Sequence, residues 1–477
     1  MSNQAAWIKE KHGRLVLDEA EIPIPGENEV LVKVDLIAFS PIESKIQTFG
    51  THPIPYPNIL GQSFAGTVQS IGPNVTSYKP GDRIASNRGA KAVGDPRFGS
   101  YQKYALASVS SSSKIAPDVD LQGAATSIVN LAAVVSALSI YLGLDRPPLS
   151  GKPEPKSKKV LIYGGSSSTG GLAVRYAVTA GYTVVTTSSP QNREFVESLN
   201  PAYIIDHTAP AETIVEELRS QGPFDSIFDT IGLPPVTNIL IKYISSIGGG
   251  KYNSLIPPIG GEDPMPDNVE RLFAPYSRAF EDEANREIAR WLFEEYLPNG
   301  LQSGLVVPTR AQVVEGGLDN AQQALDLMTQ NAVSGHKLIL NPWAGKDVAV
   351  YLNSLAPSMT QSGNLIVGRY FPMALRRVML EVCSCSPVGG AFTAPVVFSS
   401  SQEKTPAVMR PAAPSSKSPV DGLSGYLRAF DVGTVVAVGS KTPPGIVGAG
   451  GVVVLGQVTQ TLVVFESKDG HGHEGQQ

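Results

Sequence analysis

The stretch from Val160 to Asp206 constrains the fold of this chain more than any other. An apolar run over 160–163 has the length of a buried parallel strand. A turn of Gly, Ser and Thr residues follows over 164–171, then an apolar helix over 172–180 and a second strand over 182–187. These segments form one βαβ unit, whose turn and helix N-terminus offer bare backbone N–H groups to a pyrophosphate. The pattern predicts a nucleotide-binding unit.

The glycine-rich turn departs from the usual fingerprint. Small residues are expected at Gly164, Ser167 and Gly170, so the middle glycine is a serine here. Hydroxyls within the turn are candidate donors to phosphate: Ser166, Ser167, Ser168 and Thr169. Taken alone, such a turn is equally compatible with an ordinary tight turn between a strand and a helix.

The end of the second strand indicates which dinucleotide binds. A free ribose 2′-hydroxyl usually meets Asp or Glu at this point. Here Ser189, Asn192 and Arg193 follow the strand, and Glu194 is the first carboxylate. Hydroxyls, an amide and a guanidinium suit a 2′-phosphate, so we expect NADP(H) rather than NAD(H). Ser189 and Pro190 also read as the start of a helix, and both interpretations can hold.

Composition and charge narrow the class of protein. The chain has 477 residues and a formal net charge of −5, which allows two domains and rules against nucleic acid as a main partner. The apolar run Ile128–Leu144 contains Asn130 and is marginal for a membrane span, so we expect a buried helix and no membrane association. Residues 1–10 lack the apolar core of a signal peptide, and the only cysteines are Cys383 and Cys385. A cytoplasmic enzyme is the simple inference.

Strand and helix patterns divide the chain into blocks. Alternating segments over 5–17 and 29–39, and further strands to about residue 110, predict a small β-rich domain with Gly/Pro turns. A helix is expected over 118–144. Beyond the βαβ unit, strand and helix alternate, which predicts a doubly wound parallel sheet. The remaining expected elements are a strand at 224–232, a helix at 235–246, a turn and strand at 248–255, a helix at 282–297, strands at 306–308 and 337–340, and a helix at 317–330.

The order of several motifs resembles the medium-chain dehydrogenase/reductase superfamily, and within it the zinc-free fungal branch of stand-alone trans-acting enoyl reductases, "zinc-binding alcohol dehydrogenase domain" relatives and quinone oxidoreductase-like proteins. The matching stretches are Ser40–Lys45, Gly61–Gly66, Pro80–Arg83, Phe98–Tyr101, Gly164–Gly171, Ser189–Asn192, Gly249–Tyr252 and Ser334–Leu338.

The resemblance implies an α/β fold in which a GroES-like β-rich domain is interrupted in sequence by a Rossmann domain, with the cofactor in the cleft between them. The expected bounds are 1–125 for the first part of the GroES-like domain and 126–299 for the Rossmann domain. Residues 300–342 are expected to return to the GroES-like domain, and 343–477 to form an extension.

The resemblance also bears on metals. Zinc-dependent members carry Cys near Ser40 and a His–Glu pair inside Gly61–Gly66, where this chain has Gln62 and Ser63. Residues 87–105 lack the four thiolates of a structural zinc site, and the histidines are scattered without ligand spacing. We expect no metal site.

Zinc-free relatives reduce a C=C bond conjugated to a carbonyl, or a quinone. The resemblance therefore implies an NADPH-dependent enoyl or enone reductase in fungal secondary metabolism, with quinone reduction as the alternative. The substrate would be an enone, an enoyl thioester or a quinone, and a polyketide synthase is a candidate partner. A non-catalytic NADP(H)-binding sensor or partner protein is the alternative of another class.

Residue roles follow from the motifs that match. Lys45 resembles the lysine beside the nicotinamide ribose and is the first candidate catalytic residue, with Glu43 as its expected ion-pair partner. Tyr56 and Tyr252 are candidate hydrogen-bond donors, with a core position as the alternative. His207 stands where many relatives have a tyrosine near the adenine. The cofactor-binding set implied by the resemblance is Lys45, Gly164, Ser166, Ser167, Ser168, Thr169, Gly170, Ser189, Asn192, Arg193, His207, Ser254, Leu255 and Lys337.

Residues 343–477 lie outside the resemblance. They are rich in Val, Ser, Gly and Pro, with sparse charge and no motif. We expect a largely disordered extension, or the product of a misjoined reading frame, rather than a third domain. Limited proteolysis that leaves a stable fragment ending near Asn341 would support this hypothesis, whereas a protease-resistant full-length chain would contradict it.

Overall fold

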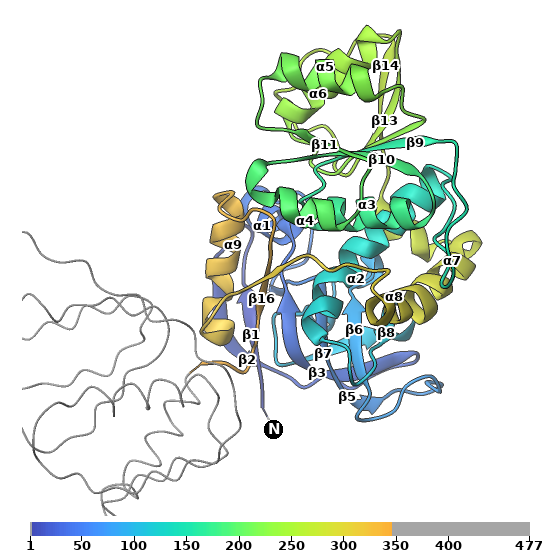
Figure 1. Ribbon diagram of the computed structural model, residues 1–477. Coiled ribbons are helices and arrows are strands. Elements are labelled where there is room, and N and C mark those ends of the chain that lie inside the picture. The colour runs from blue at the N-terminus through green and yellow to red at the C-terminus, as the bar shows by residue number, and fades with distance from the viewer. Residues whose placement is uncertain (1, 346–477) are drawn as a thin grey trace, which may run out of the picture. The chain divides into compact units, whose positions relative to one another are not determined.

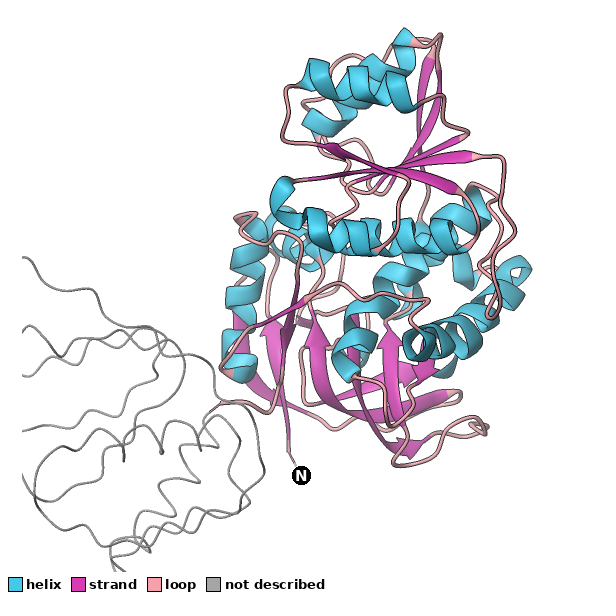
Figure 2. Ribbon diagram, viewed as in Figure 1, coloured by secondary structure: helices cyan, strands magenta, loops and turns pink. Residues whose placement is uncertain are grey.

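Two β-sheet systems with helices around them make up the described part of the chain (Figure 1). The computed structural model describes residues 2–345. One system is antiparallel and β-rich, and the other is a parallel sheet covered by helices on both faces (Figure 2). The predicted α/β class, with a β-rich part and a doubly wound parallel sheet, is confirmed.

The β-rich part contains a three-stranded sheet in the order β2-β1-β4 and a larger sheet in the order β15-β16-β3-β5-β6-β8, with β7 paired to β3. Its N-terminal elements are β1 (Asn3–Ile8), β2 (Leu15–Ala20), β3 (Glu29–Ala38), α1 (Pro41–Phe49), β4 (Asn58–Ile59), β5 (Ser63–Ile71), β6 (Arg83–Asn87), η1 (Ala90–Ala92), η2 (Pro96–Phe98), β7 (Tyr104–Ser108), η3 (Val109–Ser111) and β8 (Ser112–Lys114).

The segment 5–17, which was predicted as a continuous strand, is instead a hairpin. Its two arms, β1 and β2, pair in antiparallel register from Asn3 opposite Ala20 to Ile8 opposite Leu15. His12 has a φ of 62° in the connecting turn, and Gly13 follows it. The alternation of apolar residues is that of a strand, but it continues on both sides of the turn and so hides the reversal.

The Rossmann part is a six-stranded parallel sheet in the order β11-β10-β9-β12-β13-β14. Val160 and Ile162 of β9 pack with α3, whereas Leu161 and Tyr163 pack with α5 and α6, so alternate side chains serve opposite faces. The elements are β9 (Lys159–Tyr163), α3 (Ser168–Thr179), β10 (Thr183–Ser188), η5 (Pro190–Asn192), α4 (Arg193–Ser198), β11 (Tyr203–Asp206), α5 (Ala211–Gln221), β12 (Ser226–Asp229), α6 (Pro234–Ser246), β13 (Gly250–Ser254) and β14 (Val269–Phe273).

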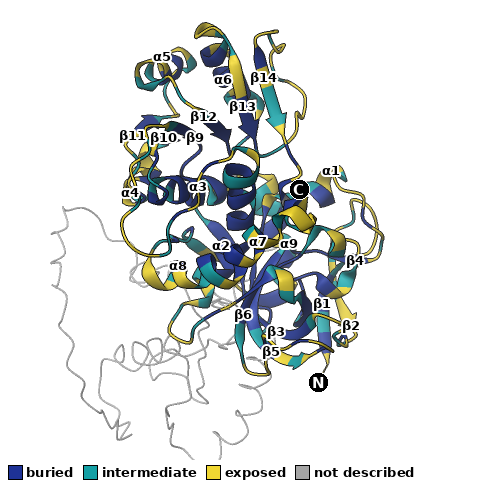
Figure 3. Ribbon diagram, turned by 90° about the vertical axis from the view of Figure 1, so that its right-hand side faces the viewer, coloured by how far each residue is buried: buried dark blue, intermediate teal, exposed yellow. Residues whose placement is uncertain are grey.

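A long apolar helix joins the two parts. It comprises α2 (Leu121–Val135) and the π-helical turn η4 (Ser136–Tyr141). Its length and composition would suffice to cross a membrane, but 72% of its most apolar window is buried inside the protein. It packs against α3 and against β5 and β6, and Figure 3 shows α2 and α3 largely buried. The helix therefore belongs to the core, as predicted.

The chain then returns to the β-rich part. The predicted helix at 282–297 is longer and includes a π-helical stretch, while the predicted strand at 306–308 is irregular and pairing begins after Pro308, at β15. Proline cannot donate a ladder hydrogen bond. The returning elements are η6 (Tyr276–Glu281), η7 (Glu283–Asn285), α7 (Arg286–Arg290), η8 (Trp291–Tyr296), α8 (Leu297–Ser303), β15 (Ala311–Val313), η9 (Gly317–Asn320), α9 (Ala321–Thr329) and β16 (Lys337–Leu340).

The last described residues still contact the β-rich part. The indole N–H of Trp343 donates to the carbonyl of Val34 at 2.6 Å, and its ring packs edge-on against Tyr104. The predicted bound at residue 342 therefore falls just short of a packed residue. The hypothesis of a disordered or misjoined extension covers residues 343–477, of which 346–477 lie outside the described residues.

Arg88 fixes the loops beside the larger sheet. Its side chain is 4% exposed, and its guanidinium donates to the carbonyls of Ile59, Ala92, Val93 and Asp95 and to the side-chain oxygen of Asn58. Arg88→Met should lower the free energy of unfolding by about 3 kcal/mol or more, because several buried acceptors lose their donor at once. The measurement is the thermal unfolding midpoint by circular dichroism.

A matched control is Arg14→Met, which removes an exposed guanidinium paired with Asp326 at the surface. Its unfolding midpoint should stay close to the parent's, because exposed ion pairs contribute little. Equal midpoints for the two variants would show that the loop anchor is unimportant.

Candidate active site

The glycine-rich turn lies between β9 and α3, at the carboxyl end of the parallel sheet, where nucleotides bind in this architecture. Gly164 has a φ of 93°, a conformation that favours glycine. The first N–H groups of α3, those of Ser168 and Thr169, have no acceptor within the helix, because helix geometry leaves them free. This end of the helix can therefore accept an anion.

Ser167 has a different role from the predicted phosphate contact. Its hydroxyl oxygen accepts from the backbone N–H of Gly170 at 2.9 Å, so it caps α3. Thr230 donates its own hydroxyl proton to the carbonyl of Tyr163, so the Ser167 hydroxyl donates to Thr230 at 3.0 Å. The hydroxyl of Ser167 is thus fully engaged inside the protein, and only its backbone can face a phosphate. The sequence could not identify Thr230 as the partner, 63 residues away.

Gly170 lies where the helix crosses the turn at very close range. A Cβ atom at this position would lie 2.0 Å from the carbonyl oxygen of Gly164. No side chain fits there without moving the backbone, so the close approach of helix and turn requires glycine at Gly170. The donors of the turn and this narrow approach fit a bound pyrophosphate.

Polar side chains lie together at the end of β10. The arginine that contacts them is not the predicted one. Arg193 points to Glu197, forming an ion pair at 2.9 Å on the surface of α4. Arg310 instead donates to the Asn192 side-chain oxygen at 2.5 Å and to the Gly335 carbonyl at 3.1 Å, and it lies over the Phe195 ring. Asn192 in turn donates to the hydroxyls of Ser189 and Ser334.

Arg310 belongs to the segment that returns from the Rossmann part, 118 residues after Asn192. No local pattern could have assigned it to this place. His207 directly follows β11, next to the end of β10, and is exposed; its backbone N–H donates to the Ser188 carbonyl. The residues predicted to contact the 2′-phosphate and the adenine thus follow the carboxyl ends of the neighbouring strands β10 and β11.

Two opposite charges are buried between α1 and β16. Glu43 is fully buried, and its carboxylate accepts from the N–H groups of Ser40 and Gln62 and from the Tyr101 hydroxyl. Burial raises the pKa of Glu43, whereas these hydrogen bonds and the charge of Lys337 oppose the rise. Lys337 is 3% exposed, and burial lowers its pKa while the charge of Glu43 counteracts the shift.

Lys337 also begins a chain of hydrogen bonds that reaches the glycine-rich turn. Its ammonium group donates to the Asn130 side-chain oxygen at 2.6 Å and to the Ser40 hydroxyl at 3.2 Å. The Asn130 amide nitrogen donates to the Thr169 hydroxyl at 3.1 Å. We call Ser40, Lys337, Asn130 and Thr169 the buried relay. It links the end of β3 to the start of α3. In the sequence, Asn130 stands out only as a polar residue within an apolar helix.

Two expectations about individual residues need correction. Glu43 pairs electrostatically with Lys337 rather than with Lys45. Tyr252 is 1% exposed and packs beneath α5 and α6, so it faces the core and cannot reach a substrate in this conformation. Lys45 is half-buried on α1, burial lowers its pKa, and no acidic partner is recorded for it within residues 2–345.

The last two predicted cofactor residues lie at the end of β13. The Ser254 hydroxyl is buried and accepts from Arg271 at 3.0 Å. Leu255 donates its N–H to the carbonyl of Asp229, at the end of β12, and its side chain packs on the core. Both residues thus lie at adjacent strand ends, at the carboxyl edge of the parallel sheet.

Metal chemistry does not fit the residues at Ser40. The Lys337 ammonium lies 3.2 Å from the Ser40 hydroxyl, and a second cation beside it would be repelled. Ser63, at the other position where zinc-dependent relatives have ligands, donates its hydroxyl to the Ala38 carbonyl. Within residues 2–345 no three His, Cys, Asp or Glu side chains gather into a possible metal site.

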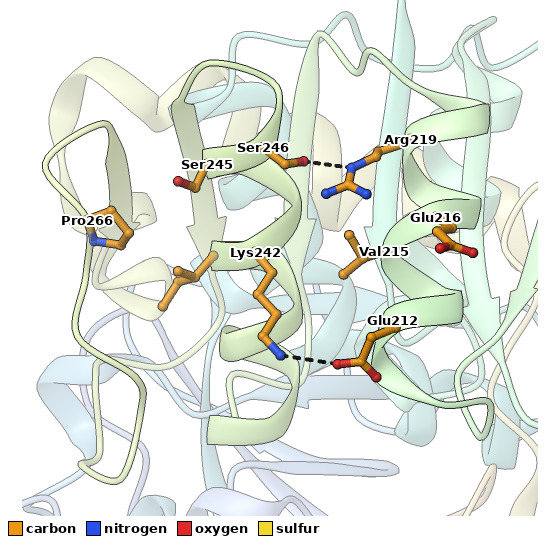
Figure 4. A pocket seen from close by; sticks show the side chains of 9 residues that line it. Glu212, Val215, Glu216, Arg219, Lys242, Ser245, Ser246 and Pro266 are labelled. Atoms are coloured by element: carbon orange, nitrogen blue, oxygen red, sulfur yellow. Dashed lines mark hydrogen bonds and ion pairs between the residues drawn. The ribbon is translucent and has the colours of Figure 1, made fainter.

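A surface hollow of about 490 Å³ lies elsewhere, between α5 and α6 (Figure 4). Lys242 faces Glu212 at 3.5 Å and Arg219 donates to Ser246 at 2.9 Å across it. These helices cover the face of the sheet opposite to α3 (Figure 1). The hollow is therefore separate from the glycine-rich turn and from the buried relay.

A GroES-like β domain joined to a parallel nucleotide-binding sheet, with a phosphate-accepting turn, defines a dinucleotide-dependent oxidoreductase. Residues 26–117 match the alcohol dehydrogenase GroES-like domain. The chain is 30% identical over 341 residues to the trans-enoyl reductase himH of Aspergillus japonicus, covering 71% of this chain and 97% of that protein. It is 28% identical over 345 residues to the zinc-binding alcohol dehydrogenase domain-containing protein cipB of Emericella nidulans, covering 72% and 98%.

Solved structures share the fold. A mycobacterial protein solved with NADPH matches with a TM-score of 0.57 and 20% identity, covering 72% of this chain and all of that one. A quinone oxidoreductase from Pseudomonas syringae matches with a TM-score of 0.56 and 21% identity over the same shares. The chain belongs to the medium-chain dehydrogenase/reductase superfamily, in the fungal branch that contains trans-enoyl reductases.

Gly170→Val should weaken NADPH binding at least tenfold, because the added side chain collides with the Gly164 carbonyl and displaces the start of α3. The measurement is NADPH affinity by fluorescence titration, with circular dichroism to verify folding. Ser167→Gly is the comparison: it removes a cap hydroxyl, and glycine at this position costs a helix only a few tenths of a kcal/mol. A folded Gly170→Val protein with parental affinity would mean that the turn does not hold the cofactor.

Proposed function

We propose that this protein is an NADPH-dependent reductase of an activated C=C bond, an enoyl or enone reductase of fungal secondary metabolism. The observation that carries the proposal is the similarity to a trans-enoyl reductase over nearly the whole length of that relative. The glycine-rich turn on a parallel sheet, together with the polar groups at the end of β10, supports the choice of cofactor.

Three parts of the chain would hold the cofactor. The free N–H groups at the start of α3 would bind the pyrophosphate. Ser189, Asn192 and Arg310 would bind the 2′-phosphate. Lys45, on α1, remains the candidate beside the nicotinamide ribose. When bound, NADPH supplies a hydride to the carbon β to the carbonyl.

The protein must then handle the charge that develops on the substrate. Addition at the β-carbon leaves an enolate, whose oxygen needs hydrogen-bond donors and whose α-carbon needs a proton. The buried junction of α1, α2 and α3 offers hydroxyl and ammonium donors of the buried relay for this purpose. We propose that the chemistry needs no metal, because a resident ammonium occupies the region where zinc-dependent relatives bind theirs.

Quinone reduction is the second candidate, supported by the shared fold of a quinone oxidoreductase. A non-catalytic NADP(H)-binding role is the alternative of another class. The substrate is a small molecule in both enzymatic cases. A polyketide synthase that presents an enoyl thioester is the proposed partner, and a cytoplasmic location is the proposed setting.

The direct test is oxidation of NADPH by the full-length protein in the presence of enones, enoyl thioesters and quinones, followed by product identification. We expect turnover of enones or enoyl thioesters with saturation of the C=C bond. Turnover of quinones alone would favour the second candidate. Tight NADPH binding without turnover of any substrate would favour the non-catalytic role.

The choice of cofactor gives a separate prediction. NADPH should bind at least tenfold more tightly than NADH, which is about 1.4 kcal/mol, because charge-assisted hydrogen bonds hold the 2′-phosphate. Arg310→Met should erase most of this preference, since it removes the guanidinium stacked on Phe195 and bonded to Asn192. Affinities for both cofactors are measured by fluorescence titration.

The matched control is Arg193→Met. Arg193 is paired with Glu197 and its side chain is about half exposed, so the preference should survive its loss. Equal affinity of the parent protein for both cofactors would overturn the 2′-phosphate site. A preference lost with Arg193 rather than with Arg310 would restore the prediction made from the sequence.

A further inference from the structure

Ser40 holds an unused hydrogen-bond donor in a buried place. It directly follows β3 and is the N-cap of α1, with 7% of its surface exposed. Its backbone N–H donates to Glu43, and its hydroxyl oxygen accepts from Lys337. Among the described residues, no acceptor is recorded for the hydroxyl proton of Ser40. A buried hydroxyl whose oxygen faces an ammonium group is therefore ready to donate to a bound molecule.

Lys337 is held in a fixed position behind this hydroxyl. Two of its three protons have acceptors, Ser40 and Asn130, and Asn130 is itself held by Thr169 at the start of α3. The lysine comes from β16, which pairs antiparallel with β3. The ammonium and the hydroxyl therefore lie at the same junction as the glycine-rich turn, where an NADPH-dependent reaction would take place.

We propose that Ser40 is the catalytic acid that protonates the substrate, and that Lys337 supplies the proton through the Ser40 hydroxyl. This proposal rests on the proposed enoyl reductase function. The O–H bond of Ser40 breaks, and the electron pair of the enolate double bond forms the new C–H bond at the α-carbon as the carbonyl re-forms. One N–H proton of Lys337 moves to the Ser40 oxygen. Lys337 is left neutral and regains a proton from water at the end of the cycle.

The electrostatic surroundings suit this role. Glu43 is the charged group that acts on Lys337, and its carboxylate interacts in turn with Tyr101 and Arg88. The relay residues on α2 and α3, Asn130 and Thr169, are neutral. Burial lowers the pKa of Lys337, which makes its ammonium a stronger acid than an exposed lysine, while Glu43 keeps it charged in the resting enzyme. The lysine must be protonated to act, so activity should fall as pH rises through this lowered pKa.

The test compares Ser40→Ala, Lys337→Met and the parent enzyme, each as the full chain with NADPH and an enone that the parent reduces. In Ser40→Ala, kcat should fall by about 10²-fold or more, the usual contribution of a positioned acid, with NADPH affinity within twofold of the parent. The isotope effect with deuterated NADPH should shrink and the solvent isotope effect should grow, because protonation becomes the slow step. Lys337→Met should lower kcat, because the source of the proton is gone, and its remaining activity should no longer fall at high pH.

Ser112→Ala is the matched control, since its buried hydroxyl bonds to Ser86 and to the Ser108 carbonyl within the β-rich part. It should keep the parental kcat, pH profile and isotope effects. A Ser40→Ala enzyme with parental kcat and isotope effects would overturn the assignment of the acid while leaving the reductase function intact. Failure of the parent enzyme to reduce any enone would overturn the reductase function, and this inference with it.

Discussion

The pairing of the Glu43 and Lys337 charges inside the protein is the interaction on which the rest of the site depends. A charged group away from water is costly unless hydrogen bonds and an opposite charge compensate it. Glu43 receives three donors, and Lys337 finds acceptors on α1 and α2. These partners belong to elements that must all be in place before either charge is compensated. The folded arrangement of α1, α2 and β16 is therefore tightly specified.

The order of the elements along the chain explains why this charge pair forms only when the whole fold is complete. The chain builds most of the β-rich part, leaves through α2 to build the parallel sheet, and returns to add β16 beside β3. Lys337 meets Ser40 across 297 residues. The relay then continues through Asn130 to Thr169, so one line of hydrogen bonds joins both sheet systems. A site assembled this way keeps its donors at fixed distances from the glycine-rich turn, which is what a reaction between a cofactor and a substrate requires.

The two ends of the proposed cofactor site follow the same principle. At the turn, the backbone forms the site, because Gly170 approaches the Gly164 carbonyl too closely for any side chain. At the end of β10, side chains form the site, and the segment that returns from the Rossmann part places Arg310 against Asn192. Backbone donors recognise any pyrophosphate, whereas the guanidinium would discriminate the 2′-phosphate. In the proposed site, binding and selectivity would thus rest on different parts of the chain.

The sequence by itself determined the βαβ unit, the β-rich domain before it and the membership of the superfamily, because apolar periodicity, glycine positions and motif order are local properties. It missed the reversal between β1 and β2, because alternation continues across that turn. It did not foresee that Arg310 contacts Asn192 while Arg193 pairs with Glu197. It also paired Glu43 with a neighbour on the same helix, and it offered Tyr252 to the substrate although this side chain faces the core. Only the tertiary structure decided these side-chain contacts. The pairing of β16 with β3 and the contact of Arg310 with Asn192 both join residues more than 100 positions apart. Such partners are chosen by packing and by the compensation of buried charge, which no local pattern encodes.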